Sequence, residues 1–258
     1  MPPRKKKRPR AVQTVITIMV LSAVAGMLYV VALWWQSRQM QMVRYKEFGI
    51  PIPEQYAIHG IDVSRYQQLI SWSSVQAMQV KKIKLRFTFI KATEGTGRSD
   101  PFFKRNWKKA KESRITRGAY HFFTPWKDGK TQAKNFIQTV QLESGDLPPV
   151  LDVEQLRGAT PQQLRTGVLE WLKEVEAHYG VTPIIYTNAD FYQRYLGAAF
   201  DDYPLWVAHY LQPHQPRIGR QWSFWQHSEQ GRVNGILSKV DFNVFNGDST
   251  DFQSLLLP

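Results

Sequence analysis

The chain contains no cysteine among its 258 residues. Disulfide bonds and thiolate metal sites are therefore excluded, and the chain can function in an oxidising or a reducing compartment. Acidic residues are also few, because 21 Asp and Glu accompany 34 Lys and Arg and leave a net charge of +13. A disordered chain is nevertheless excluded, since 43% of the residues are apolar and 13% are aromatic.

Charge is absent from residues 11–35, which read AVQTVITIMVLSAVAGMLYVVALWW. As a helix this stretch would be about 37 Å long, more than the ~30 Å of a bilayer core. Residues 1–10 hold six Lys and Arg and no acid. Positive charge on this side predicts a single-pass membrane protein with a cytoplasmic N-terminus, membrane lipid around residues 11–35, and the remaining chain outside, in the periplasm or the extracellular space.

Three alternatives to an anchor are open for the apolar stretch. A signal peptide could be cleaved after the small residues Ala23-Val24-Ala25, although ten largely apolar residues follow them. A buried core helix is disfavoured, because the stretch is apolar on every side. A nuclear-localisation signal is disfavoured for the basic cluster, because the adjacent span explains its charge.

The remaining sequence divides into a linker and one domain. Residues 36–56 are polar and Pro-rich at their end, and they are expected to form a juxtamembrane linker. Residues 57–258 alternate five short apolar strands with five helical segments, and three further strands follow without helices. This order predicts an α/β fold, a TIM-like β/α barrel of parallel strands with eight strands and five helices, preceded by the transmembrane helix. The clearest helix is expected between Thr160, an N-cap followed by Pro161, and Gly180.

Polar residues recur where the predicted strands end, which is where chemistry occurs in β/α barrels. The residues at these ends are Asp62, Glu94, Tyr120, His121, Asp152, Glu154, Tyr186, His209, Tyr210, Gln226, His227, Asp241 and Asn243. Because they come from eight separate segments, we expect them to meet at one rim. Glu94 is expected to be a structural or rim hydrogen-bonding residue, and His121 a core residue.

Asp152 and Glu154 are the most informative of these residues. At positions i and i+2 of a strand, their side chains face the same way, with Cα atoms about 6.5 Å apart. Like charges at this distance raise one pKa, and a protonated carboxyl can donate to a leaving oxygen, as glycosidic cleavage requires. A metal site is a weaker alternative without Cys or an HExxH motif. A structural acid pair, satisfied by amides or by Lys and Arg, stays open.

The complete pattern resembles glycoside hydrolase family 25, the lysozymes of the cellosyl type. The resemblance covers about residues 57–247 through nine motifs in order: GIDVSRYQ, FTFIKATEGT, DPFFKRNW, RGAYHFF, LPPVLDVE, PIIYT, LWVAHY, FWQHS and VDFNVFNG. It implies a β/α barrel that cleaves the β-1,4 bond between N-acetylmuramic acid and N-acetylglucosamine. The implied partner is therefore the glycan strand of peptidoglycan. A chitinase-like DxxDxDxE pattern fits less well, because Val150 replaces its middle Asp.

The resemblance also implies roles for individual residues. Glu154 would be the general acid/base, and Asp152 would assist the substrate acetamido group. Asp62 and Asp241 would be the other acids of the cleft. Five residues are expected to contact sugar: Tyr120, Tyr186, Trp206, Tyr210 and Gln226. No metal and no cofactor is expected, a monomer is expected, and His209 is assigned no role.

Two other functions compete with hydrolysis. A non-catalytic, membrane-anchored wall-binding protein could use the same fold, but it would be expected to have lost the acid at Glu154. Nucleic-acid binding could use the basic surplus, but the sequence shows no module that reads nucleic acid.

Overall fold

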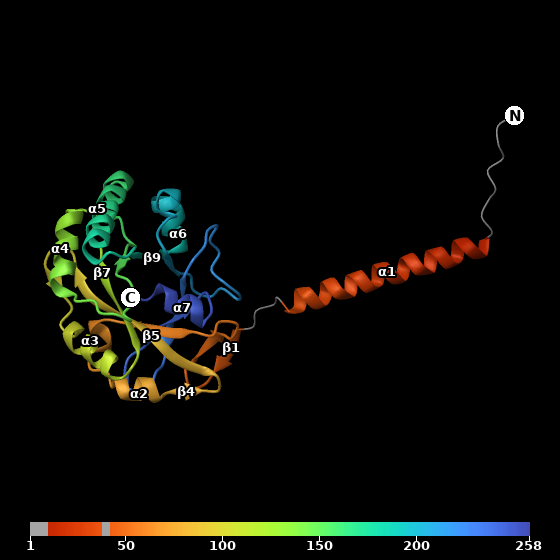
Figure 1. Cartoon of the computed structure of the whole chain (residues 1–258), viewed down its shortest axis with the longest axis horizontal. Coiled ribbons are helices and arrows are strands. Elements are labelled where there is room, and N and C mark those ends of the chain that lie inside the picture. The colour runs from red at the N-terminus through yellow and green to blue at the C-terminus, as the bar shows by residue number, and fades with distance from the viewer. Residues whose placement is uncertain (1–9, 38–41) are drawn as a thin grey trace. The chain divides into compact units, whose positions relative to one another are not determined.

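The computed structural model describes residues 10–37 and 42–258, in two compact units (Figure 1). Within the first unit, α1 (Arg10–Ser37) is a single helix. Its segment Thr14–Ala32 has a mean hydropathy of 2.4, with none of it buried in protein, and is long enough to cross a membrane. A signal sequence shares these properties. Most of the predicted basic stretch lies outside the described residues.

The second unit is a closed eight-stranded barrel, as the sequence predicts. Its strands follow the order β3–β12–β11–β10–β9–β8–β7–β5, and β5 pairs with β3 to close the ring. The strands are β3 (His59–Val63), β5 (Ile83–Glu94), β7 (Thr116–Phe122), β8 (Val150–Asp152), β9 (Ile184–Asn188), β10 (Leu205–Ala208), β11 (Phe224–Gly231) and β12 (Val240–Phe245).

The prediction of an all-parallel barrel is wrong for its last strand. β12 runs antiparallel to both of its neighbours, β11 and β3. The physical reason is the connection 232–239, which contains no helix. A parallel return needs a long crossover, whereas a short connection joins antiparallel strands. The start of β12 therefore lies where the other strands end, and we call that end of the barrel the mouth.

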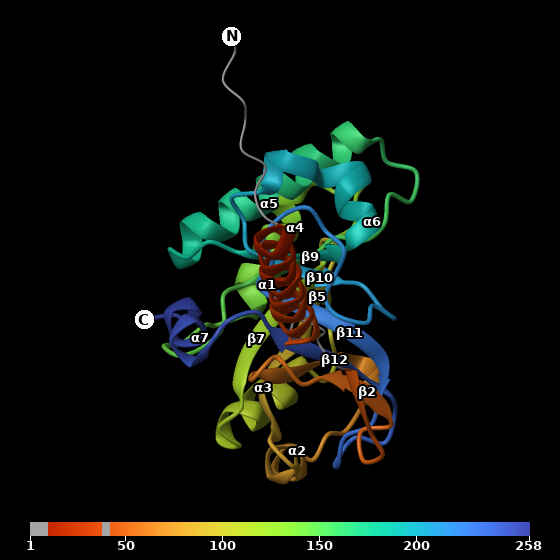
Figure 2. The ribbon, with the colours of Figure 1, turned by 90° about the vertical axis from the view of Figure 1, so that its right-hand side faces the viewer.

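Each predicted helical segment contains a helix, although two of them are short. The helices are α2 (Trp72–Ala77), α3 (Phe103–Glu112), α4 (Gly129–Thr139), α5 (Pro161–Tyr179) and α6 (Ala189–Phe191), with the single turn η1 (Arg65–Gln67) before α2, and the turns η2 (Tyr192–Leu196) and η3 (Gly197–Phe200) after α6. In α5 the expected N-cap Thr160, first-turn Pro161 and terminal Gly180 are all present. The structure adds that Thr160 forms a capping box with Gln163 and that Gly180 is left-handed. Figures 1 and 2 show α5 and α6 on the flank of the barrel opposite α2.

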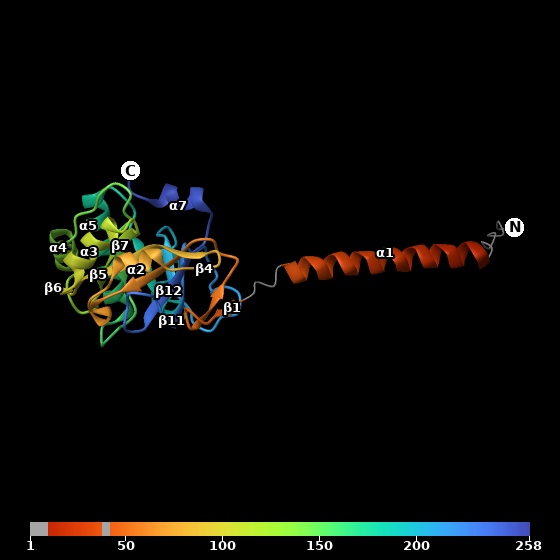
Figure 3. The same ribbon diagram turned by 90° about the horizontal axis from the view of Figure 1, so that it is seen from below.

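A further helix closes the end of the barrel opposite the mouth, which we call the base. Helix α7 (Ser249–Leu255) was not expected, because its seven residues hold little periodic signal. Asp248 caps its first turn through the backbone amides of Thr250 and Asp251. Phe252 packs against the rings of Phe87 and Phe245 at the base. Figure 3 shows α7 at the edge of the barrel unit, next to the C-terminus.

The barrel unit begins at Met42, although the sequence predicts a linker up to residue 56. β1 (Met42–Tyr45) and β2 (Ile50–Pro53) form an antiparallel hairpin, and Phe48 in its turn packs on Phe242 of the barrel. The sequence of β2 does not predict a strand because it contains two prolines, which are depleted in strands generally but tolerated in edge strands. Two short strands, β4 (Gln79–Val80) and β6 (Arg98–Ser99), pair with β5.

Aromatic rings fill the base. Phe87, Phe89 and Phe224 lie with ring centroids 5.1 to 5.7 Å apart. Gly60 makes room for them, because a Cβ at that position would lie 2.6 Å from the ring of Phe87. Since residues two apart share one face of a strand, the residues after this layer point into the mouth.

Candidate active site

Two aspartates meet across the first and last strands of the barrel. Asp62 of β3 is directly opposite Asp241 of β12. Oδ2 of Asp62 accepts hydrogen bonds from Nε2 of Gln226 at 2.8 Å and Nδ2 of Asn243 at 2.7 Å. Burial, together with the adjacent Asp62 charge, raises the pKa of Asp241 to about 9. Near neutral pH Asp241 is therefore protonated, and the pair shares a hydrogen bond.

The amide groups that hold Asp62 are themselves oriented by aromatic residues. The hydroxyls of Tyr186 and Tyr210 donate to Oε1 of Gln226 at 2.8 and 2.6 Å. Trp206 donates from its indole nitrogen to Oδ1 of Asn243 at 2.8 Å. With its oxygen occupied, each amide presents its NH₂ to the Asp62 carboxylate.

Most of the residues expected to contact sugar lie deeper than the sequence suggests. Trp206 is only 2% exposed and Gln226 3% exposed, and their polar atoms are used within the protein. Tyr120 and Tyr186 are also buried, whereas Tyr210 is partly exposed. The structure therefore shows Trp206 and Gln226 as supports of Asp62, and contact of these five residues with sugar stays a prediction.

Asp152 and Glu154 lie at the end of β8. The strand itself stops at Asp152, and Val153 continues its ladder by donating to the Tyr186 carbonyl at 2.9 Å. Asp152 is 6% exposed, and its Oδ1 has no hydrogen-bond partner in the described part of the chain. Burial and the neighbouring Glu154 charge raise the pKa of Asp152 well above its ordinary value. Burial also raises the pKa of the partly exposed Glu154.

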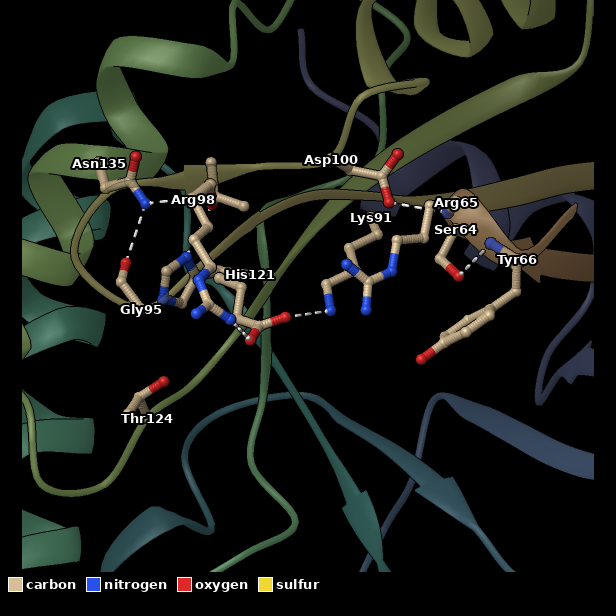
Figure 4. A network of polar contacts seen from close by, with 12 residues as sticks. Ser64, Arg65, Tyr66, Lys91, Gly95, Arg98, Asp100, His121, Thr124 and Asn135 are labelled. Atoms are coloured by element: carbon tan, nitrogen blue, oxygen red, sulfur yellow. Dashed lines mark hydrogen bonds and ion pairs between the residues drawn. The ribbon is translucent and has the colours of Figure 1, made fainter. Parts of the chain in front are cut away.

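A lysine counters this negative charge. Lys91 lies two residues after Phe89 on β5, and its Nζ donates to Glu94 Oε2 at 2.8 Å (Figure 4). Its charge lowers the pKa of both Asp152 and Glu154, although burial outweighs it. Lys91 therefore brings positive charge to the mouth.

The carboxylate of Glu94 pairs with two basic residues, first with Lys91. It also accepts from Arg98 at 3.3 Å (Figure 4). Burial opposes its ionisation, but the hydrogen bond and charge of Lys91 prevail, and the pKa of Glu94 is lowered. Nearby, the backbone amide of Arg65 donates to Asp100 at 2.7 Å.

Two residues of this site have no role predicted from the sequence. Asn243 lies two residues after Asp241 and so shares its face of the strand. Lys91 lies within the apolar run RFTFIKAT, where a lysine is unusual for a buried strand. In both cases the sequence signal is a polar residue at a strand position whose side chain faces the barrel interior.

A cavity of about 460 Å³ opens beside the acids. Glu154, Tyr186 and Tyr210 line it, together with His209, whose Nδ1 accepts the Arg217 amide at 3.1 Å. Its volume suits a small organic ligand such as one or more sugar rings. A larger hollow of about 620 Å³ lies over α2 and α3, and none of the four mouth acids lines it.

The buried histidines lie away from this cavity. His121 bonds to Thr93 at 2.7 Å and stacks on Trp171, so it belongs to the core between barrel and helices, as expected. His227 lies between Trp225 and Phe242. Within residues 10–37 and 42–258, no group of three or more His, Asp or Glu residues is arranged to hold a metal ion.

Comparison with known proteins decides the family. The profile of Glycosyl hydrolases family 25 matches residues 61–236, which is more than half of the chain. The chain belongs to glycosyl hydrolase family 25. The prediction of a glycoside hydrolase is therefore confirmed.

The relatives of this family 25 chain include bacterial lysozymes. It is 36% identical over 213 residues to Lysozyme M1 of Streptomyces globisporus, covering 77% of this chain and 71% of that protein. It is 49% identical to YegX of Escherichia coli K12 over 82% of this chain and 78% of that protein.

Solved family 25 structures share the fold. A family 25 glycosyl hydrolase from Bacillus anthracis superimposes with a TM-score of 0.72 at 32% identity, covering 79% of this chain and 95% of that one. The lysozyme from Streptomyces coelicolor gives a TM-score of 0.69 at 35% identity over 77% and 96% of the two chains.

Proposed function

We propose that this family 25 hydrolase is an N-acetylmuramidase that cleaves the β-1,4 bond between N-acetylmuramic acid and N-acetylglucosamine in peptidoglycan. Relatives named as lysozymes and as N,O-diacetylmuramidases support this substrate. The observation that carries the proposal is the pair at the end of β8: Glu154 on the cavity, and Asp152 beside it with a buried, unpartnered Oδ1. A buried acceptor without a donor is costly, and a substrate N–H would satisfy it.

The proposed mechanism begins with the proton shared by this pair. Burial raises the pKa of both carboxyls, so the pair favours retaining a proton, which either residue can hold. When the acetamido N–H of the substrate donates to Asp152, ionised Asp152 is favoured and the proton moves to Glu154. Protonated Glu154 then donates it to the leaving glycosidic oxygen, while the substrate acetamido oxygen bonds to the anomeric carbon. Water next attacks that carbon and displaces the acetamido oxygen, and its proton returns to Glu154.

The pair of Asp62 and Asp241 supplies negative charge on another side of the mouth. Burial raises the pKa of Asp62, but the two amide donors and Asp241 oppose this effect, so that Asp62 is the ionised member of the pair and Asp241 holds the proton between them. A fixed carboxylate there would stabilise the positive charge that develops on the sugar ring in an oxocarbenium-like transition state.

The direct test is cleavage of purified peptidoglycan by the full chain in detergent. We expect release of new reducing ends, and mass spectrometry should identify N-acetylmuramic acid at those ends. Glu154→Gln should lower the rate about a thousandfold or more without changing thermal unfolding. Glu47→Gln, which removes an exposed acid from the hairpin turn, is the matched control and should be fully active.

The same assay separates the alternative of a non-catalytic wall-binding protein. If the full chain binds insoluble peptidoglycan but releases no reducing ends under any condition, the muramidase proposal is wrong and the binding role replaces it. Retention of Glu154, with its pKa raised at the edge of a cavity, favours catalysis.

We propose in addition that α1 anchors the enzyme in a membrane with the N-terminus in the cytoplasm and the barrel outside. The apolar span Thr14–Ala32 and the basic residues before it support this orientation. The chain should resist carbonate extraction from membranes, and external protease should reach only the barrel. A mature N-terminus just after Ala25 would show instead that the segment is a cleaved signal peptide.

A further inference from the structure

The loop that follows Glu154 has an unusual backbone. Arg157 has a φ of 41° and Gly158 a φ of 87°, so two consecutive residues adopt the left-handed region. Glycine does so freely, but for arginine this conformation is strained. Strain of this kind persists where the surroundings impose it, and it is concentrated at functional sites. The loop therefore holds the Arg157 side chain in a position that an ordinary backbone would not give.

Arg157 lies over the ring of an exposed tryptophan. Its guanidinium carbon lies 5.9 Å from the ring centroid of Trp126, which is 50% exposed in the loop after β7. The β7 and β8 strands are neighbours, so both loops leave the mouth side by side. A half-exposed tryptophan presents a flat apolar ring to solvent, against which the face of a sugar can pack.

The guanidinium has no anionic partner of its own. Among the described residues no carboxylate forms an ion pair with Arg157, and the side chain is exposed. A guanidinium that contacts a ring through its face keeps its edge N–H donors available for an anion. Its charge still reaches the acid pair, because it lowers the pKa of Glu154 against the dominant effect of burial.

We propose that Trp126 and Arg157 form a subsite for a carboxylate-bearing sugar, in which the ring packs against the sugar and the guanidinium binds its carboxylate. The inference rests on the proposed muramidase function, and it assigns the chain a preference for anionic over neutral glycans. In peptidoglycan, carboxylates come from the lactyl ether of N-acetylmuramic acid and from attached peptides. A guanidinium fork suits either one, since it can make two parallel hydrogen bonds to a carboxylate.

The test measures binding of soluble glycans to the full chain in detergent by calorimetry, in a Glu154→Gln background that prevents turnover. Four ligands are compared: peptide-free glycan, peptide-bearing glycan, and each of these after conversion of its carboxylates to neutral amides. The first two arms distinguish the lactyl from the peptide carboxylate. Arg157→Asn is the main variant, because asparagine tolerates the left-handed backbone.

We expect Arg157→Asn to weaken binding of the carboxylate glycans about tenfold and to leave binding of the amidated glycans unchanged. Arg157→Lys should recover only part of the loss, because it restores charge without the fork. Trp126→Ala should weaken all four ligands about fivefold. Arg86→Gln, which removes an exposed arginine from the lower part of β5, controls for net charge and should bind like the parent.

Two results would overturn the subsite. In the first, Arg157→Asn binds every glycan as tightly as Arg86→Gln does. In the second, it weakens carboxylate and amidated glycans equally, so that charge is not what the residue recognises. Absence of turnover by the wild-type chain, with the expected binding pattern intact, would reject the catalytic proposal and leave the subsite standing.

Discussion

The two ends of the barrel are built from the same strands but hold opposite kinds of residue. At the base, Phe89 stacks on Trp206 with centroids 4.3 Å apart, and rings fill the space. At the mouth, two residues further along β5, the corresponding position holds Lys91. Two residues of a strand span only about 6.6 Å. The packed aromatic layer at Phe89 is therefore followed directly by a layer of charged side chains at Lys91. The difference teaches that the base stabilises the fold, while the mouth holds groups that weaken it.

The mouth weakens the fold because its carboxyls are easier to ionise in the unfolded chain. A folded-state pKa above the unfolded value means that raising the pH removes protons from the unfolded state first. Asp241, with a pKa of about 9, shows this most clearly. Removing a packed ring at the base should therefore lower the free energy of unfolding, and removing a buried carboxyl at the mouth should raise it.

The largest expected effect is at the base. Phe89→Ala should lower the free energy of unfolding by about 4 kcal/mol, because it removes a fully buried ring that packs on Phe87, Phe224 and Trp206. Guanidinium denaturation of the full chain in detergent measures this value. A loss below about 1 kcal/mol would show that the base is not the main stabilising layer.

At the mouth, Asp241→Asn should instead raise the free energy of unfolding at pH 7, by about 2 kcal/mol. Asn keeps a donor towards Asp62 but needs no proton. The wild type is expected to lose stability as the pH rises from about 4 to about 9, between the unfolded and folded pKa values. Unfolding measured across that range should show a flatter curve for the variant. An equal slope in both proteins would contradict the assigned protonation.

The buried histidines should give a pH dependence of opposite sign. Burial lowers the pKa of His227 to about 3, whereas the unfolded histidine titrates near 6.5. The unfolded state therefore binds the proton first as the pH falls below 6.5, and stability declines by up to about 1.4 kcal/mol per pH unit for this residue. His227→Leu should remove that contribution between pH 6.5 and 5 in thermal unfolding. If the stability of the variant falls with decreasing pH as steeply as that of the wild type, His227 is accessible to protons in the folded state.

The smallest expected effect on stability is at the exposed Trp126. Although it is larger than Phe89, Trp126→Ala should change the free energy of unfolding by no more than about 0.5 kcal/mol, because half of the side chain is already in water. Denaturation under the conditions used for Phe89→Ala gives a direct comparison. A loss of 2 kcal/mol or more would mean that Trp126 is part of the packed core.

The barrel and its ring of polar groups could be predicted because both depend on local patterns. Alternating strands and helices indicated the barrel, and acids at the ends of apolar strands indicated the mouth. The direction of β12 could not be read from its own residues, because it depends on the connection before it. The hairpin at 42–53 was concealed by its prolines, and α7 by its length.

The hydrogen bonds that hold Asp62 could not be predicted for a different reason. That Gln226 and Asn243 both donate to Asp62 depends on side-chain orientation across three strands, and no spacing in the sequence encodes it. Likewise, the hydrogen bond from the Trp206 indole to the Asn243 amide depends on β10 and β12 lying around the same barrel interior.

The antiparallel pairing of β12 with β3 has a consequence for the timing of biosynthesis. Asp62 and Asn243 are 181 residues apart in sequence, yet they touch. A ribosome must therefore translate past Asn243 before this carboxylate can acquire its amide donor and its Asp241 neighbour. A nascent chain that still lacks β12 would hold Asp62 without the partners that the proposed muramidase needs there.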